Sequence, residues 1–445
     1  MGLVVLIATL CFLLLDMERC DLIIMNKWNF IHKVLIICIL PAWAWAAPVD
    51  TVREQQFINQ QQRQQALENQ LAPPSPDIHL SAEEINTDDG LFPVEQPCFA
   101  ISQIILQGAD ALPHWLPLPR QANKAIGRCL GGKGINLLMA QLQNILIDRG
   151  YITSRILAPQ QDLKSGVLRL VVMPGYIREA RLTEDSDDYL WLASAFPATD
   201  GKLLDLRDIE QGMEQINRLR SEPVQIEILP DAEPGYSVVN LTATPEFPLT
   251  GSLSLDNSGQ KSTGEKQLTA TLYASNIAGL ADKWFFSGGR SSDFASAYEA
   301  QSVQAGLSVP YGYALFDYSY SWNNYRTTFT QRGFDWVSTG DSSTHRFNAS
   351  WVAFRNGDIK TALAAGVTRR STRNWLNDAL LASSSRDLTS LTLGINHTQK
   401  LLGGVATFNP AFSRGMPWFN AESDAGKAPD EPRAAFRKWS LSASY

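Results

Sequence analysis

The residue types that most often carry out chemistry are few and scattered in this sequence of 445 residues. The five histidines lie far apart, without the short spacings that bring metal ligands together. They are His32, His79, His114, His345 and His397. No Gly-x-Ser-x-Gly segment, which presents the nucleophile in many hydrolases, occurs in the chain. The sequence therefore predicts no metal site, no cofactor and no catalytic residue, and we expect the protein not to be an enzyme.

A glycine-rich stretch, Gly127 to Lys133, comes close to the phosphate-binding loop of nucleotide-binding proteins. It departs from that motif at Gly134, where a Ser or Thr should bind magnesium, and a predicted helix rather than a strand precedes it. The chain also has a net charge of -7 and no basic stripe. Neither nucleotide binding nor nucleic-acid binding is therefore expected.

The region from Leu249 to Tyr445 alternates apolar and polar residues with a period of two. In Leu315 to Trp322, for example, every second residue is aromatic and the residues between are Asp or Ser. The same alternation occurs in Leu268 to Ser275, Arg346 to Phe354, Leu391 to Thr398 and Trp439 to Tyr445. Such segments are typical of half-buried strands with one apolar and one water-facing side.

These strands are expected to form a transmembrane β-barrel, with a soluble all-β domain as the alternative. The strand candidates are about ten residues long, which is enough to cross a bilayer. Aromatic residues are expected near strand ends, as in a membrane-interface girdle. They are Tyr311, Tyr313, Trp322, Tyr325, Trp336 and Trp418.

An export signal is expected within residues 1–46. Met25 is a candidate for the true start, followed by a basic segment, the apolar run Val34 to Leu40, and a cleavage site between Ala46 and Ala47. The alternative is a signal anchor built from both apolar runs of this segment. After cleavage, no apolar stretch of transmembrane-helix length remains, so we expect the outer membrane of a Gram-negative bacterium.

Three of the five cysteines, Cys11, Cys20 and Cys38, lie in the segment that cleavage removes. The remaining two, Cys98 and Cys129, would meet an oxidising periplasm. We expect one disulfide between them, which would contribute roughly 3 kcal/mol by closing a loop of about thirty residues. Two buried free thiols are the alternative.

Two segments of low apolar content precede the folded region. Residues 47–72 are rich in Gln and form either a polar helix or a disordered stretch. Residues 73–97 contain Pro73-Pro74-Ser75-Pro76 and an acidic cluster, so an extended linker is expected.

Residues 98–245 are predicted to contain two copies of a β-α-α-β-β unit, the first in 98–175 and the second in 176–245. The first copy has strands at 100–107, 154–158 and 167–173 and helices at 120–130 and 135–149, the second helix ending at Gly150. The second copy has strands at 177–183, 224–229 and 237–243 and helices at 189–196 and 206–219. Residues 246–445 form the region of amphipathic strands.

This order of parts resembles the two-partner secretion outer-membrane transporters, which include the hemolysin secretion/activation proteins, the filamentous haemagglutinin transporter and the contact-dependent inhibition transporters. The resemblance covers nearly everything from Met25 to Tyr445. Its most specific stretches are Cys98-Phe99-Ala100-Ile101, Gly150 to Arg155, Asp256-Asn257-Ser258-Gly259 with Thr263-Gly264, Asn276 to Asp282, and Gly415 to Phe419.

The resemblance implies an α+β pair of periplasmic POTRA domains, an antiparallel transmembrane barrel, and a helix at 51–71 that plugs the resting pore. It implies secretion, without ATP, of an exoprotein of hemolysin, adhesin or contact-dependent inhibition toxin type. Further implied partners are outer-membrane lipid, the Sec export machinery and the barrel-assembly machinery. Cargo would add to a strand edge and groove of the first POTRA domain. The candidate residues are Leu137, Leu142, Ile145, Ile156 and Leu157, for which a place in the core is the alternative.

The sequence departs from the family in one respect. The family's barrel has about sixteen strands, whereas about ten candidates are found here, and no Val-Arg-Gly-Phe or Val-Arg-Gly-Tyr motif occurs. We therefore expect a C-terminally truncated, incomplete barrel that does not necessarily form a working pore. The alternative functions are an outer-membrane protein assembly factor and a small-solute porin; a porin would keep its conductance without residues 98–245.

Overall fold

The computed structural model describes residues 80, 85, 92–186, 190–197, 200–291, 299–331, 333–428 and 431–445. The predicted signal segment, its cleavage site at Ala46 and Ala47, and the Gln-rich segment lie outside these residues, as does most of the linker. No helix in the described ranges is long and apolar enough to cross a membrane. The described residues all fall within one compact unit, Pro73–Tyr445.

The first repeat is a three-stranded sheet covered by helices. Its sheet has the order β2-β5-β4, with β2 parallel and β4 antiparallel to the central β5. The elements are β1 (Phe99–Ala100), β2 (Gln103–Gln107), α4 (Leu118–Ala122), β3 (Cys129–Leu130), α5 (Gly132–Asp148), β4 (Arg155–Leu157) and β5 (Val167–Met173), with short 3-10 turns at Ala109–Ala111, Asn123–Ala125 and Leu163–Ser165.

The core of the first repeat follows from two sequence periods. Leu138, Leu142 and Leu146 recur every four residues along α5, and all three are fully buried. Every second residue of β5 meets them from the sheet, including the fully buried Leu168 and Leu170. Helix α5 then stops before Gly150, whose φ of 93° is the left-handed conformation of a C-terminal cap, as the sequence predicts.

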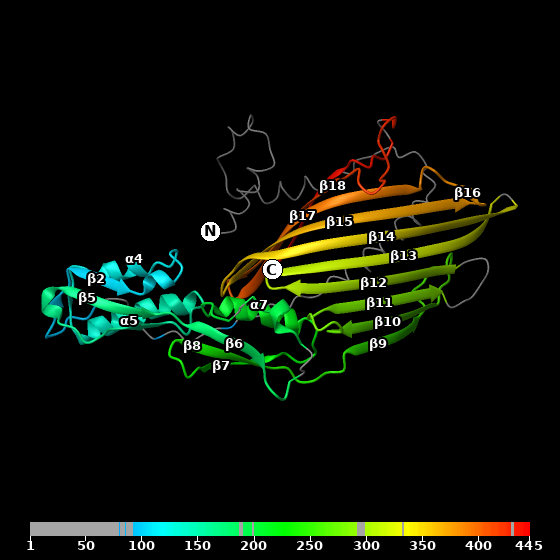
Figure 1. Cartoon of the computed structure of the whole chain (residues 1–445). Helices are drawn as coiled ribbons and strands as arrows, with labels where there is room; N and C mark the ends of the chain where they lie inside the picture. The colour runs from blue at the N-terminus through cyan, green and yellow to red at the C-terminus, as the bar shows by residue number, and fades with distance from the viewer. Residues whose placement is uncertain are drawn as a thin grey trace, which may run out of the picture. The chain divides into compact units, whose positions relative to one another are not determined.

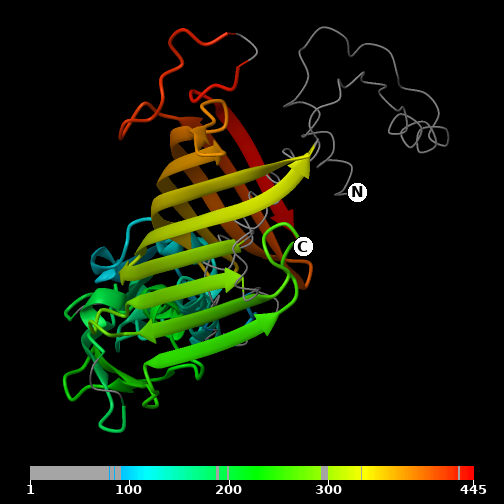
Figure 2. The ribbon, with the colours of Figure 1, turned by 90° about the vertical axis from the view of Figure 1, so that its right-hand side faces the viewer.

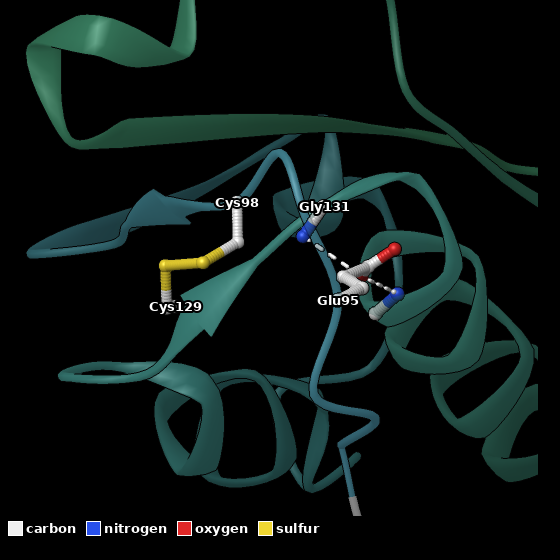
Figure 3. Close-up of a disulfide and its surroundings, with 5 residues drawn as sticks. Glu95, Cys98, Cys129 and Gly131 are labelled. Atoms are coloured by element: carbon white, nitrogen blue, oxygen red, sulfur yellow. Dashed lines mark hydrogen bonds between the residues drawn. A yellow bond between two sulfur atoms is a disulfide. The ribbon is translucent and has the colours of Figure 1, made fainter.

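The helix predicted for residues 120–130 is wrong in its second half. The chain leaves the helical region at Ile126, which is extended. Gly127 follows with a φ of 80°, and Cys129–Leu130 forms strand β3 against β1. Cys98 and Cys129 form a disulfide with 5.3 Å between their Cα atoms, beside this two-stranded pairing (Figure 3). The extended pairing outcompetes helix propensity here because the crosslink holds the two short strands together.

The second repeat has the same order of elements and the same sheet arrangement. Its elements are β6 (Tyr176–Leu182), α6 (Leu192–Ala195), α7 (Leu206–Asn217), β7 (Gln225–Pro230) and β8 (Tyr236–Thr242). The sheet has the order β6-β8-β7, again with a parallel first and an antiparallel last pair. Ile209 and Ile216 of α7 are buried against Val239 and Leu241 of the central strand.

The remaining residues form one antiparallel sheet of eleven strands, in which each long strand pairs with its neighbours in sequence. The strands are β9 (Leu249–Asp256), β10 (Gln267–Ser275), β11 (Lys283–Ser291), β12 (Glu299–Tyr311), β13 (Ala314–Gln331), β14 (Phe334–Arg355), β15 (Ile359–Leu376), β16 (Ala379–Leu380), β17 (Arg386–Leu401), β18 (Gly404–Gly415) and β19 (Arg437–Ser444). The sheet curves, but in the part of the chain that the structure describes β9 and β19 each pair on one side alone, so the sheet is not closed (Figures 1 and 2).

The pairing register confirms the predicted alternation of faces. Phe316 lies opposite Ala349, and the same row continues across the sheet to Phe412 and Trp439. Phe316 is 42% and Trp439 is 78% exposed, so the described residues do not cover this apolar face. The opposite face carries polar residues such as Asp317.

Two expectations about these strands need correction. Strands of about ten residues describe β9 to β11, but β13, β14 and β15 have 18, 22 and 18 residues. Trp322 therefore lies in the middle of β13 rather than near its end. The backbone pairing continues through segments with polar residues on both sides, such as Ser342-Ser343-Thr344, where side-chain alternation no longer marks a strand.

We predict that replacing both cysteines, Cys98→Ser with Cys129→Ser, lowers the stability of the first repeat. The bond closes a loop with a sequence separation of 31 residues, so the expected loss is about 3–4 kcal/mol. The loss of stability is measured by urea unfolding of the full chain, with proteolytic cleavage within residues 98–175 as the signal that the first repeat has unfolded. Reduction of the wild-type protein should reproduce the loss, and an unchanged midpoint in both cases would contradict the prediction.

Candidate functional site: the tandem repeats and their junction with the sheet

The five residues predicted to bind cargo do not share one accessible surface. Leu142 is fully buried and Ile156 is only 7% exposed, so both belong to the core of the first repeat. Leu137 and Ile145, on α5, are partly buried. Leu157, on the edge strand β4, is 45% exposed. Only Leu137, Ile145 and Leu157 therefore remain candidates for direct contact with another chain.

The edge of β4 is partly occupied by a side chain from α5. Gln143 donates from Nε2 to the carbonyl oxygen of Ser154 at 2.8 Å, and its Oε1 accepts from the backbone N–H of Ile156 at 3.1 Å. The amide thus takes the place that a neighbouring strand would occupy beside β4. Sequence reasoning missed Gln143, and the only signal was a polar residue at a helix position between buried leucines.

The glycine-rich segment that resembles a phosphate loop is filled by a carboxylate of this chain. Glu95 accepts hydrogen bonds from the backbone N–H groups of Gly131, Lys133 and Gly134 at 2.7–3.0 Å (Figure 3). These hydrogen bonds lower the pKa of the Glu95 carboxyl, and the bond from Gly134 has the largest effect. Glu95 therefore caps the start of α5, whose own N-cap residue, Gly131, has no side chain to do so.

The two repeats are joined by backbone hydrogen bonds at two glycines. Leu206 N–H donates to the carbonyl of Gly150, and Leu204 N–H donates to that of Gly175, each at 2.9 Å. Gly175 N–H donates to the hydroxyl of the fully buried Ser154 at 3.0 Å. A side chain at Gly150 would collide with the Asp205 carboxylate, at 2.5 Å. This close contact gives the repeats a defined mutual orientation.

Asp205 is a partly buried acid at this junction between the repeats. Its Oδ1 accepts from Arg207 N–H at 2.8 Å, which caps the start of α7. Burial raises the pKa of the Asp205 carboxyl to about 6, despite that hydrogen bond. Burial likewise raises the pKa of the neighbouring Tyr151 to about 12, with Asp205 and Asp208 adding to the effect. The ionised form of Asp205 is therefore held at a cost in the folded protein.

We predict that Asp205→Asn stabilises the junction at neutral pH, because Asn caps a helix without a charge to bury. A pKa raised from 3.8 to about 6 means that the wild type keeps its full stability below pH 4 and loses some as the pH rises through 6. The expected gain is about 1–3 kcal/mol at pH 8 and none at pH 4. Thermal unfolding at both pH values measures it. Asp162→Asn, at an exposed cap, is the matched control, and an equal effect of the two variants at pH 8 would count against the prediction.

Helix α7 is held against the sheet by a cluster of buried charges. Arg355, at the end of β14, donates to Glu210 at 3.0 Å, to Gln211 at 3.2 Å and to Glu214 at 3.1 Å. The side chain of Arg355 is 1% exposed, and those of the two glutamates are 0% and 4% exposed. Lys360, at the start of β15, also donates to Glu214, at 2.6 Å. We call these residues, with Arg207, the Arg355 cluster.

The spacing along α7 explains how one helix makes two buried faces. Glu210 and Glu214 are four residues apart and point to the same side, whereas Ile209 and Ile216 point into the second repeat. Arg207 pairs with Glu210, which also accepts from the backbone N–H of Leu80 at 2.6 Å. Sequence analysis predicted this helix but not the burial of its charged face, because such a face usually meets water.

Both ends of α7 also contact the turns between strands. Near its start, Asp208 accepts from the Tyr313 hydroxyl in the β12–β13 turn. At its end, Arg218 donates to the carbonyl of Ala281 and to the hydroxyl of Ser308, both at 2.9 Å. Burial lowers the pKa of Arg218 to about 10. Figure 1 shows α7 at the ends of the strands that carry these turns.

The Ala281 turn is one of the stretches that carries the family resemblance. The Asp282 carboxylate accepts from the N–H groups of Ala278 and Leu280 and from the Trp284 ring, the last at 2.6 Å. Asn276 accepts from Ala281 N–H at 3.0 Å. Asn276 and Ala281 both have positive φ, so these side-chain bonds offset the cost of a tight turn. The turn thereby presents its carbonyl to Arg218.

We predict that Arg355→Met loosens α7, because it leaves Glu210 and Glu214 with less compensating charge in a buried site. Loss of one partner of a buried ion pair costs about 3–5 kcal/mol. Hydrogen exchange of the α7 amides in the full chain should accelerate by about 100-fold or more. Arg326→Met, at an exposed position of β13, is the matched control. Unchanged exchange in α7 would show that the cluster does not hold the helix.

In the described part of the chain, no group of three or more His, Cys, Asp or Glu side chains is placed to hold a metal ion. The acidic residues near α7 instead face cationic side chains of the sheet. The buried charged side chains of α7 and of the strand ends are bonded to one another or to polar groups of the protein, so they attach the second repeat to the sheet.

A family model described as haemolysin secretion/activation protein ShlB/FhaC/HecB matches residues 235–445. A ShlB-type POTRA model and a second POTRA model match residues 99–175 and 176–230.

Outer membrane transporters match this chain over most of its length. The outer membrane transporter CdiB of Escherichia coli is 50% identical over 397 residues, which are 88% of this chain and 65% of that protein. CdiB of Dickeya dadantii is 47% identical, over 88% of this chain and 68% of that protein. A solved structure of CdiB from Escherichia coli has a TM-score of 0.80 and 49% identity, over 90% of this chain and 74% of the other. The chain thus spans slightly less than two thirds of the first relative's length.

Proposed function

The chain belongs to the haemolysin secretion/activation protein family ShlB/FhaC/HecB, and we propose that it acts in two-partner secretion, carrying a large exoprotein from the periplasm across the outer membrane. In this proposal the POTRA repeats lie in the periplasm, the large sheet lies in the membrane, and the Sec and barrel-assembly machineries deliver the chain there. The exported partner is an exoprotein of hemolysin, adhesin or contact-dependent inhibition toxin type.

The observation that carries the proposal is the attachment of α7 to the turns at one end of the sheet. Through the Arg355 cluster and Arg218, the second repeat contacts the ends of β11 to β15 rather than a strand edge or the apolar face. A chain bound to the repeats is therefore held next to the strand ends, where a path along the inner face would begin.

The two faces of the sheet support the same proposal. The apolar face is suited to lipid, since its aromatic and aliphatic side chains are exposed. The other face is lined by rows of polar residues, such as Ser319, Arg346, Thr368 and Ser390, which lie opposite one another on adjacent strands. The backbone N–H and C=O groups of an unfolded polypeptide can replace their hydrogen bonds to water with hydrogen bonds to the polar side chains of this face.

Strand edges of the first repeat are the proposed place of cargo recognition. Both β2 and β4 are terminal strands of their three-stranded sheet. An extended segment could pair with either edge, and at β4 it would first have to displace Gln143. Leu157 lies on β4 beside this edge and is accessible, as an anchor for an apolar side chain of the cargo would have to be.

We predict that Leu157→Asp reduces export without unfolding the protein, because a charge beside β4 disfavours an apolar cargo side chain. The expected decrease in exoprotein at the cell surface is about fivefold, equivalent to about 1 kcal/mol of lost binding. The measurement is surface display of a co-expressed exoprotein carrying its N-terminal secretion domain, with outer-membrane amounts of both variants compared on gels.

Ile126→Asp is the matched control, because Ile126 is 42% exposed and lies in the same repeat but outside β2 and β4. An equal loss with both variants would argue against recognition at the β4 edge. If the wild-type chain itself is absent from the outer membrane, the result would argue against the proposed function.

A further inference from the structure

The apolar face of the large sheet contains a hollow of about 620 Å³. Its floor is formed by small residues, among them Ala349, Ala365 and Gly394, and large side chains such as Trp351, Leu393 and Phe412 stand around it. Side chains at these positions leave the space open, because an alanine carries only a methyl group and a glycine carries no side-chain carbon. The hollow therefore offers a recess for apolar groups from the surroundings of the sheet.

Three arginines lie on the same face, directly beyond this hollow. Phe412 and Trp439 are cross-strand partners at its border, and two residues further along each strand the partners are Arg414 and Arg437. Because side chains alternate, both arginines point to the face that carries Phe412. Arg369 lies on that face as well, opposite Thr389 and two residues from Val367, the partner of Leu391.

These arginines are exposed and have no ion pair within 4.0 Å among the described residues. By contrast, Arg373, four residues after Arg369 on the same strand, pairs with Asp387. Two guanidinium groups in directly opposite positions repel one another unless an anion lies between them. A charged side chain beside a lipid-facing apolar surface is also costly unless it is paired.

Arg414 and Arg437 lie at the end of their strands opposite to the second repeat, and Arg369, within β15, lies one row further from that repeat in the pairing register. Helix α7 contacts the turn at Gly312 and the strand end at Arg355, whereas Arg414 immediately precedes the segment 415–436 at the other end of β18. With the repeats in the periplasm, this end of the sheet faces the cell surface. The hollow lies on the periplasmic side of the arginines, at the depth of acyl chains.

We propose that this face binds a lipopolysaccharide molecule, with the phosphates of its lipid A at Arg369, Arg414 and Arg437 and with acyl chains in the hollow. The proposal rests on the proposed function, since it requires the sheet to lie in the outer membrane with this end outward. Guanidinium groups bind phosphate through paired N–H donors, which neutralises the repulsion between Arg414 and Arg437. Asp387, two residues from Thr389 on the same face, is the described acid beside Arg369, and its carboxylate is paired with Arg373.

The test is native mass spectrometry of the full chain, extracted in a mild detergent from the outer membrane, with lipid A identified by mass. We expect the wild type to retain lipid A and the variant R369Q/R414Q/R437Q to retain about tenfold less. Ala365→Phe, which fills the hollow without changing charge, should reduce retention as well. The control R120Q/R128Q/R169Q removes three exposed arginines of the first repeat and should retain as much as the wild type.

A second measurement adds purified lipid A to the detergent-solubilised wild type and compares it with lipid A that lacks one phosphate. Weaker binding of the latter supports the proposal even if the arginine variant fails to assemble. Equal retention by all variants, or retention of glycerophospholipid in place of lipid A, would overturn it while leaving secretion intact. Absence of the wild type from the outer membrane would instead overturn the proposed function along with this inference.

Discussion

The burial of Arg355 between Glu210 and Glu214 is the interaction on which the arrangement of this protein depends. A guanidinium that is 1% exposed is tolerable only because two carboxylates and the Gln211 amide satisfy its donors. Those carboxylates, in turn, are buried only because α7 lies against the strand ends. The charges therefore specify one position for α7 against the sheet, since any displacement of the helix would leave a buried charged side chain without its partner.

From that contact, a continuous set of short connections extends to the first repeat. Helix α7 packs Ile209 and Ile216 into its own repeat, and its first residue, Leu206, hydrogen-bonds to Gly150 at the end of α5. Gly175 adds a second connection through Leu204 and Ser154. A segment bound at the first repeat is thus linked to the sheet by packed elements rather than by a flexible tether, as the proposed function requires.

The large sheet obeys a different constraint, because its two faces meet different media. Its apolar face is covered by no other part of the described protein, and in the proposed function the bilayer covers it. The polar face retains hydrogen-bonding groups that water or a passing chain can satisfy. The hollow near Ala365 and the arginines beyond it are a local exception on the apolar face, because one patch there combines an apolar cavity with positive charge.

The sequence alone determined those features that follow from local periodicity. Alternation by two indicated the strands of the sheet and their faces, the four-residue spacing of Leu138, Leu142 and Leu146 indicated α5, and Gly150 indicated where that helix ends. The repeated order of elements and the motifs around Cys98 and Asn276 indicated the family. Each of these signals depends on residues close together in the chain.

Only the tertiary structure decided which polar residues are buried and with what partners. Arg355 and Glu210 are 145 residues apart, and nothing in either neighbourhood distinguishes them from solvated charges. The same holds for Gln143, which satisfies the edge of β4, and for Glu95, which caps α5 from the preceding linker. The paired extended strand at Cys129 was likewise invisible to helix propensity, since its partner lies across the disulfide loop. Such pairings are energetically decisive because burial makes an unpaired polar group costly, and burial is a property of the whole fold.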